Sequence, residues 1–218
     1  KYIVLLNDDV MVTPNWLSPI IKLMENDSSI GACMPSILDY NNKDKYEYAG
    51  AAGGLLDKLG VPFCIGRVFD TVENKNPNYN QTNEVFWASG AALVIRKDVF
   101  INFEGFDESF FAHQEEIDLC WRILRSGYKL KIIPSSTVYH VGGGSLDYSS
   151  PYKVFLNFRN NLYTLFKNDT AFNLLWKLPL RSVLDIAASF KFLISGDTKS
   201  SWAVIKAGLS FVVNIPKL

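Results

Sequence analysis

The N-terminal part of the chain combines two patterns typical of buried strands with one helical pattern. Tyr2–Leu6 is apolar at every position, which is typical of a strand buried on both faces in the middle of a parallel sheet. Residues 29–38 predict a second buried strand, and Thr13 with Pro14 begins a helix between the two. Because a central strand has neighbours on both sides, we expect further strands of a larger protein to precede residue 1.

The middle of the chain changes pattern several times. Residues 39–84 are polar and weakly periodic, which indicates an irregular excursion with short strands. Residues 84–100 predict a strand, a Ser-Gly turn, an apolar strand and a short helix. An amphipathic helix follows and ends at Gly127. Residues 128–140 then predict a pair of strands, and 141–145 a flexible glycine turn. This alternation of strands and helices predicts an α/β fold.

The last part of the chain is helical and rich in aromatic residues. One helix is expected over 151–168, with Ser150 as its N-cap. Two apolar helices follow at 171–196 and 200–216, and Pro179 is expected to break the first. Neither offers the roughly 18 uncharged apolar residues that a membrane span requires.

These patterns divide the chain into two expected domains, 1–150 and 151–218. The basic residues of the last two helices are placed along their polar side: Lys177, Arg181, Lys191 and Lys206. Such helices suit contact with an anionic membrane surface, and they equally suit packing as a helical cap on the first domain.

Composition narrows the class of protein. Hydrophobic residues make up 48% and charged residues 20% of the chain, which excludes a disordered protein. The formal net charge is zero, so no basic field attracts nucleic acid. Three cysteines without a C-x-x-C pair do not form a disulfide framework, and they favour a reducing, cytoplasmic compartment.

Polar residues that could bind a ligand follow two of the expected strands. Asn7, Asp8 and Asp9 come directly after the first strand, at the sheet edge where α/β proteins bind ligands. Adjacent carboxylates suit a divalent cation, which could neutralise a diphosphate. An Asx-type turn explains the same residues equally well. His140 ends a later strand, where a neutral imidazole can bind a metal or simply pack in the core.

Three carboxylates crowd the start of the amphipathic helix: Glu115, Glu116 and Asp118. The helix dipole favours negative charge there, which accounts for one or two of them. Neighbouring aromatic rings disfavour the charged form of a carboxylate, whereas the helix dipole favours it. The balance of these two effects can give a carboxylate a pKa that suits a general base.

Four blocks of sequence, taken in order and spacing, resemble the family 2 glycosyltransferases of the GT-A fold. The blocks are LLNDDV, WASGAALVIRKDVF, GFDESFFAHQEEIDLCWRILRSGYKLKIIPSSTVYHVGGGS and NFRNNLYTLFKN. The resemblance covers nearly all of residues 1–168. Among the members, the chain looks most like bacterial rhamnosyltransferases that build surface polysaccharides.

The resemblance implies a Rossmann-like mixed sheet flanked by helices, truncated at the N-terminus and followed by C-terminal amphipathic helices. It implies inverting transfer of a sugar from a nucleotide-diphosphate sugar to a hydroxyl of a glycan or lipid-linked acceptor, with Mg²⁺ or Mn²⁺ bridging the diphosphate. The Gln-x-x-Arg-Trp motif of the processive synthases is absent.

The resemblance also implies roles for single residues. Glu116 matches the base that deprotonates the acceptor, with Glu115 and Asp118 beside it. The implied metal ligands are Asn7, Asp9 and His140. The implied substrate-binding residues are Asp8, Ser89, Gly90, Arg122 and Arg159.

Two other classes remain open at this point. The chain could be a non-catalytic remnant or accessory domain that docks on a partner or on the inner face of the cytoplasmic membrane. A nucleotidyltransferase also uses carboxylates and Mg²⁺, but it would need a Gly-rich, basic phosphate loop that the sequence lacks.

Overall fold

The computed structural model describes residues 1–47, 50, 52–68, 71–141 and 150–218, so most of the expected glycine turn lies outside the described residues. The chain forms two compact units. The first comprises 1–57, 62–106 and 119–144, and the second 58–61, 107–118 and 145–218. The elements are β1 Tyr2–Leu6, β2 Val10–Val12, α1 Leu17–Asn26, β3 Ile30–Asp39, β4 Gly54–Leu56, β5 Pro62–Cys64, β6 Arg67–Val68, β7 Thr71–Val72, η1 Pro77–Tyr79, β8 Asn83–Glu84, β9 Ala92–Arg96, α2 Lys97–Asn102, η2 Glu108–Phe110, α3 Glu115–Arg125, β10 Lys129–His140, α4 Pro151–Asn168, α5 Ala171–Ile194, α6 Thr198–Asn214 and η3 Ile215–Lys217.

The first unit is built on a mixed sheet with the order β1-β9-β3-β10-β2, and β8 pairs with the N-terminal part of β10. Strands β3 and β10 are parallel, and the other pairs are antiparallel. The expectation that β1 is a buried, parallel, central strand is wrong for the described sheet. There β1 pairs only with β9, and Val4 and Leu6 are exposed. An apolar run shows that a strand favours burial, but it does not show how many neighbours the strand has.

The core of this unit forms around β3, whose side chains are almost all buried, as the sequence predicted. Strand β10 corrects the expected pair of strands, because it runs unbroken from Lys129 to His140. Its pairing with β3 shifts register between Ile133 and Thr137. Pro134 lies in this interval and lacks the N–H that a regular ladder requires, which accounts for the irregularity. The strand itself continues through it.

Helix α1 begins later than the sequence suggested. Pro14 was expected in the first turn, but the helix starts at Leu17. Asn15 has φ of 60°, a left-handed conformation that a right-handed helix cannot contain. The loop expected before this helix contains strand β2, which pairs with the end of β10.

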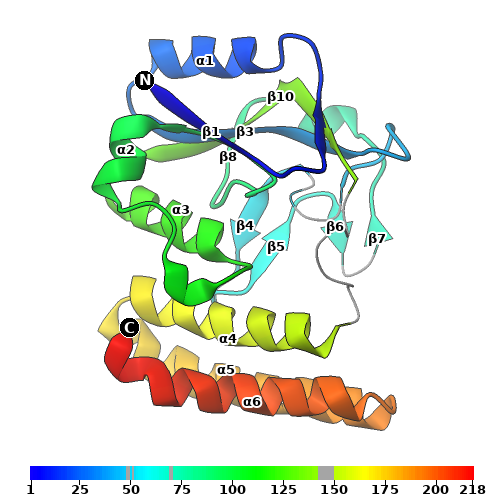
Figure 1. Cartoon of the computed structure of the whole chain (residues 1–218), viewed down its shortest axis with the longest axis vertical. Coiled ribbons are helices and arrows are strands. Elements are labelled where there is room, and N and C mark those ends of the chain that lie inside the picture. The colour runs from blue at the N-terminus through cyan, green and yellow to red at the C-terminus, as the bar shows by residue number, and fades with distance from the viewer. Residues whose placement is uncertain (48–49, 51, 69–70, 142–149) are drawn as a thin grey trace. The chain divides into compact units, whose positions relative to one another are not determined.

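The polar excursion contains short strands, as expected. In the first unit α1 lies on one side of the sheet, and the hairpins β4–β5 and β6–β7 lie on the other (Figure 1). The indole N–H of Trp87 donates to the carbonyl of Leu55 at 2.9 Å and joins the first hairpin to the segment before β9.

The second unit is dominated by α4, α5 and α6, which run side by side (Figure 1). Its buried core contains Phe110, Leu162, Tyr163 and Phe211. The expected break at Pro179 is wrong, because α5 runs through it and is 24 residues long in total. Pro179 and Leu175, four residues earlier, both lie on the exposed side of the helix, so the carbonyl that loses its N–H partner is not sealed in a core.

Arg96 joins the end of β9 to the end of α1. Its guanidinium donates to the carbonyls of Ile30 at 2.7 Å, Asp27 at 3.0 Å and Met24. A buried carbonyl that loses a charged donor keeps its desolvation cost, so this contact stabilises the first unit.

Arg96→Met should therefore lower the free energy of unfolding by about 2–4 kcal/mol, measured by urea denaturation. Arg125→Met is the matched control, since Arg125 is exposed at the end of α3, and it should change stability by less than about 0.5 kcal/mol. Equal effects of the two substitutions would contradict this role for Arg96.

Candidate active site

The turn after β1 and the end of β10 meet in the first unit. Val10 pairs with His140 in the antiparallel ladder of β2 and β10, which places the turn of Asn7–Asp9 beside the imidazole. His140 Nε2 lies 2.9 Å from Asp9 Oδ1 and 3.5 Å from Asn7 Nδ2. His140 is therefore a neighbour of two other residues predicted as metal ligands, from which it is separated by 131 and 133 positions in the chain.

A fourth residue of this cluster was not predicted from the sequence. Glu47 is buried, at 4% exposure, and its Oε2 lies 3.5 Å from His140 Nδ1. Burial lowers the pKa of His140, but the carboxylates of Glu47 and Asp9 outweigh it and raise the pKa above its ordinary value. A lone glutamate in an irregular segment carries no sequence signal, so only the structure reveals it.

The chemistry of this cluster fits a divalent cation. No group of three or more His, Cys, Asp or Glu side chains in the described ranges has a ready metal-binding arrangement. Asp9 Oδ1 and the side-chain amide of Asn7 nevertheless both approach His140 Nε2, and an amide binds a cation through its oxygen. This donor set suits Mn²⁺, and Glu47 on the far nitrogen is the kind of carboxylate partner that orients a metal-binding histidine.

The predicted turn at Ser89 and Gly90 lies beside the turn of Asn7–Asp9. Ser89 is buried, and its Oγ accepts from the backbone N–H of Ala91 at 3.3 Å. The carbonyl of Ala91 in turn accepts from the N–H of Asn7 at 3.1 Å. Gly90 is half-buried in this turn, whereas Asp8 is exposed.

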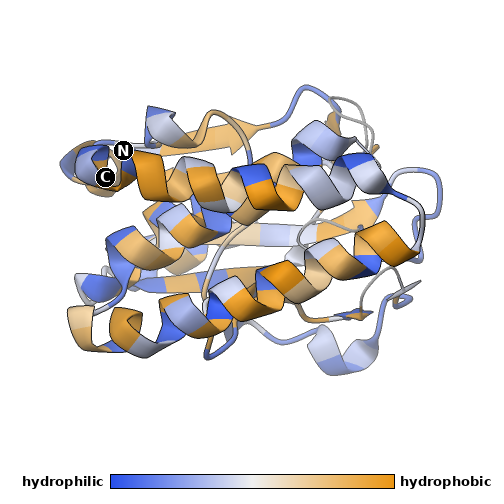
Figure 2. Ribbon diagram, turned by 90° about the horizontal axis from the view of Figure 1, so that it is seen from below, coloured by the Kyte–Doolittle hydropathy of each residue, from blue (hydrophilic) through white to orange (hydrophobic). Residues whose placement is uncertain are grey.

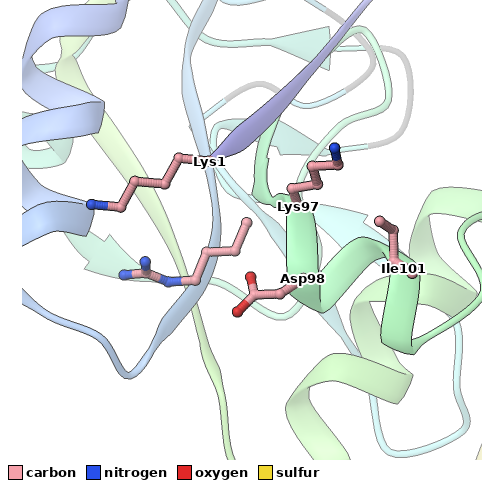
Figure 3. Close-up of a pocket in the computed structure, with 5 residues that line it drawn as sticks. Lys1, Lys97, Asp98 and Ile101 are labelled. Atoms are coloured by element: carbon pink, nitrogen blue, oxygen red, sulfur yellow. The ribbon is translucent and has the colours of Figure 1, made fainter.

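A separate pocket of about 390 Å³ lies at the opposite end of β1, lined by Lys1, Arg96, Lys97, Asp98 and Ile101 (Figure 3). The side chains of Lys1 and Lys97 point in opposite directions in this view. Its charged groups do not converge, so the pocket has no place in the candidate site.

The acidic start of α3 lies in the second unit and follows a strained loop. Phe111, His113 and Gln114 have φ of 66°, 68° and 70°. Such left-handed conformations cost roughly 1–2 kcal/mol each for residues with a side chain. Burial, followed by the charge of Glu115, raises the pKa of Glu116 to about 8. Burial also raises the pKa of Glu115.

Side chains of α4 hold this loop in place. The amide nitrogen of Asn160, which is fully buried, lies within 3.0 Å of the carbonyls of Phe110, Ala112 and His113. Asn161 donates to Gln114 Oε1 at 3.3 Å. The loop conformation is thus maintained by buried amide donors.

Three other predicted residues contact protein groups in their own units. Arg159 donates to the carbonyl of Phe110 at 2.8 Å, beside the Asn160 contact. Asp118 is fully buried and accepts from Asn168 Nδ2 at 2.6 Å, which suits a positioning role. In the first unit, Arg122 donates to the carbonyl of Gly105 at 2.9 Å and to that of Phe103.

A model of the family described as glycosyltransferase like family 2 matches residues 1–176. The chain belongs to this family.

Curated relatives of this family 2 chain are rhamnosyltransferases. Rhamnosyltransferase WbbL of Escherichia coli (strain K12) is 28% identical over 139 residues, covering 64% of this chain and 52% of that protein. N-acetylglucosaminyl-diphospho-decaprenol L-rhamnosyltransferase of Mycobacterium tuberculosis (strain CDC 1551 / Oshkosh) is 27% identical over 146 residues, covering 64% of this chain and 46% of that protein. The chain spans about half the length of these relatives.

A solved structure of GalNAc-T7 with UDP, GalNAc and Mn²⁺ matches the fold. Its TM-score is 0.52 at 19% sequence identity, and the match covers 76% of this chain and 31% of that one. The likeness confirms the GT-A-like mixed α/β fold expected from the sequence.

In this family 2 chain the loop before α3 should depend on the amide of Asn160. Asn160→Asp has the same shape but offers oxygens to three carbonyls, so it should destabilise the protein at least as much as Asn160→Ala, by about 2–3 kcal/mol. Hydrogen exchange at residues 111–114 should accelerate in both variants. Asn157→Ala, an exposed change on the same helix, is the control. Full rescue by aspartate would exclude the donor role.

The raised pKa of Glu116 predicts a pH-dependent cost to stability. The folded protein binds this proton more tightly than the unfolded chain, so the carboxylate lowers stability as the pH rises from about 4.5 towards 8. Glu116→Gln stays neutral and should melt higher than the parent at pH 8.5, by roughly 4–8 °C, with a much smaller difference at pH 4.5. Glu108→Gln, an exposed change in the preceding turn, should show no such divergence.

Proposed function

We propose that the chain contains the metal- and acceptor-binding part of an inverting glycosyltransferase. The enzyme moves a sugar, of rhamnosyl or another hexosyl type, from a nucleotide-diphosphate sugar to a hydroxyl of a glycan or lipid-linked acceptor in surface polysaccharide synthesis. The observation that carries the proposal is the 2.9 Å approach of Asp9 to His140. The names of the curated relatives support the donor class, and one of them names a lipid-diphosphate acceptor.

Asp9 and His140, with Asn7, would hold Mn²⁺ or Mg²⁺. The bound cation supplies a Lewis acid that stabilises the charge of a departing nucleoside diphosphate. Support comes from the donor set described above and from the presence of Mn²⁺ and UDP in the GalNAc-T7 structure. Asp8, Ser89 and Gly90 are proposed substrate contacts around this cluster.

Glu116 is the proposed base. Its carboxylate accepts the proton of the acceptor hydroxyl while the oxygen bonds to the anomeric carbon from the face opposite the diphosphate. The bond between that carbon and the diphosphate oxygen breaks, so the configuration inverts. With its pKa raised to about 8, the ionised form of Glu116 is a stronger base than an ordinary carboxylate, and this form becomes populated as the pH rises towards 8. Asp118 and Arg159 position the helix and its loop through their contacts with Asn168 and Phe110.

Two variants separate the proposed cation binding by Asp9 from the proposed base role of Glu116. Asp9→Asn should weaken Mn²⁺ binding at least ~10-fold, measured by electron paramagnetic resonance titration, with the exposed Asp44→Asn as control. Glu116→Gln should keep Mn²⁺ affinity within about twofold but lower sugar transfer at least ~100-fold. Transfer is measured as nucleoside diphosphate release from UDP-, GDP- and dTDP-sugars with N-acetylglucosaminyl-diphospho-polyprenol.

An unaltered Mn²⁺ titration for Asp9→Asn would refute the metal assignment. Undiminished transfer by Glu116→Gln would refute the base. Mn²⁺ binding by the parent protein without any transfer would instead favour the accessory-domain alternative.

A further inference from the structure

Helix α5 exposes its apolar side. Ten large hydrophobic side chains in this helix are exposed, and five of the most exposed are Phe172, Leu175, Val183, Phe190 and Ile194, at 59–86%. Their spacing follows the helical repeat, so they form one stripe that runs the length of the helix. A helix of a water-soluble protein normally turns such a stripe towards the core.

The inward side of α5 includes two buried polar residues. Arg181 and Ser189 are each only 6% exposed. Arg181 Nη2 lies 3.3 Å from Asp185 Oδ1, and the hydroxyl of Ser189 donates to the carbonyl of Ser201 on α6 at 3.0 Å. Leu178, which packs against the core of this unit, shares that side, so α5 carries apolar side chains on both its inward and its outward side. In water this arrangement leaves apolar area hydrated and places polar groups in the interior, so it is favoured only when an apolar partner covers the stripe.

Helix α6 extends the same kind of surface. Trp202, Leu209, Val212 and Val213 are 55–74% exposed at helical spacing. Figure 2 looks onto α5 and α6, where hydrophobic residues recur along both helices. Fourteen exposed large hydrophobic side chains on two adjoining helices exceed what a soluble monomer usually leaves to water. We call this surface the α5–α6 face.

The charge of this region indicates what covers it. Residues 171–218 contain six Lys or Arg and two Asp, whereas the whole chain is neutral. Both aspartates are engaged, Asp185 with Arg181 and Asp197 as the cap of α6, where it accepts from the N–H of Ser200 at 2.9 Å. The excess charge is therefore positive.

The structure also corrects which basic residues could meet an anionic surface. Lys177 pairs with Asp169 at 2.5 Å and Arg181 faces inward, so these two predicted residues do not. Lys191 and Lys206 are exposed, and Lys206 Nζ lies 5.9 Å from the centre of the Trp202 ring. Tryptophan next to lysine, beside a wide apolar stripe, is the composition of helices that lie in the membrane interface.

We propose that the α5–α6 face binds the surface of an anionic lipid bilayer, with both helices lying in the plane of the interface. Among the helices that the structure describes, none has the combination of length and hydropathy that a membrane-spanning segment requires. The inference does not depend on the proposed sugar transfer, because it uses only α5, α6 and their charges. It would place the protein where a lipid-linked acceptor is found.

The test measures binding of the full chain to lipid vesicles by flotation. Vesicles of phosphatidylcholine with about a third phosphatidylglycerol should bind the protein, and pure phosphatidylcholine should bind it much more weakly. Ile186→Glu should weaken binding at least tenfold. Ile101→Glu is the matched control, because it introduces the same charge at a similarly exposed isoleucine of α2 and should leave binding within twofold. Replacing Lys191 and Lys206 by Gln should weaken binding roughly fivefold each.

A second readout places the helices in the lipid. Brominated acyl chains should quench the fluorescence of the parent protein, and Trp176→Phe with Trp202→Phe should remove most of that quenching. Failure of the parent to bind anionic vesicles, equal binding by the two Ile variants, or absence of quenching would each overturn the proposal. A dimer detected by light scattering that Ile186→Glu dissociates, without vesicle binding, would assign the face to a second copy of the chain instead. None of these outcomes bears on the Mn²⁺ and transfer measurements.

Discussion

The pairing of β10 on both of its sides determines the first unit and its candidate cation site. On one side β10 pairs in parallel with β3, the most buried strand. On the other side the C-terminal end of β10 pairs in antiparallel with β2. Because β2 follows the acidic turn directly, this last ladder places Asp9 beside His140. The register matters, since side chains alternate between the faces of a sheet and a shift of one residue would turn the imidazole to the other face.

The second unit orders its acidic residues by a different means. No strand ladder reaches the loop before α3 among the described residues, and three of its residues are left-handed. Buried amides from α4 hold that loop instead, with Asn160 at its centre. Rigid support behind a carboxylate with a raised pKa is what a base requires, because reorganisation of the base would add to the barrier.

The same unit shows that the apolar face identified by helical periodicity can point either towards the core or towards the outside. Both C-terminal helices were expected to be amphipathic, and they are. The exposed stripe of α5 nevertheless faces outward, while Arg181 and Ser189 are buried on the side from which Leu178 packs on the core. Periodicity identifies the residues that share a face, whereas the partners of that face depend on the surrounding elements.

Local chemistry therefore determined much of this protein from its sequence alone. The buried strand β3, the helices α3 and α4, the left-handed Gly127 and the positions of the acidic motifs all follow from spacing, capping and turn preferences among near neighbours. The tertiary structure alone decided that β1 is an edge strand of the described sheet, that Glu47 reaches His140, that Asn160 supports the loop before α3, and that an apolar stripe of α5 faces outward. Each of these depends on contacts between distant parts of the chain, and a linear pattern of apolar and polar residues does not record which distant groups meet.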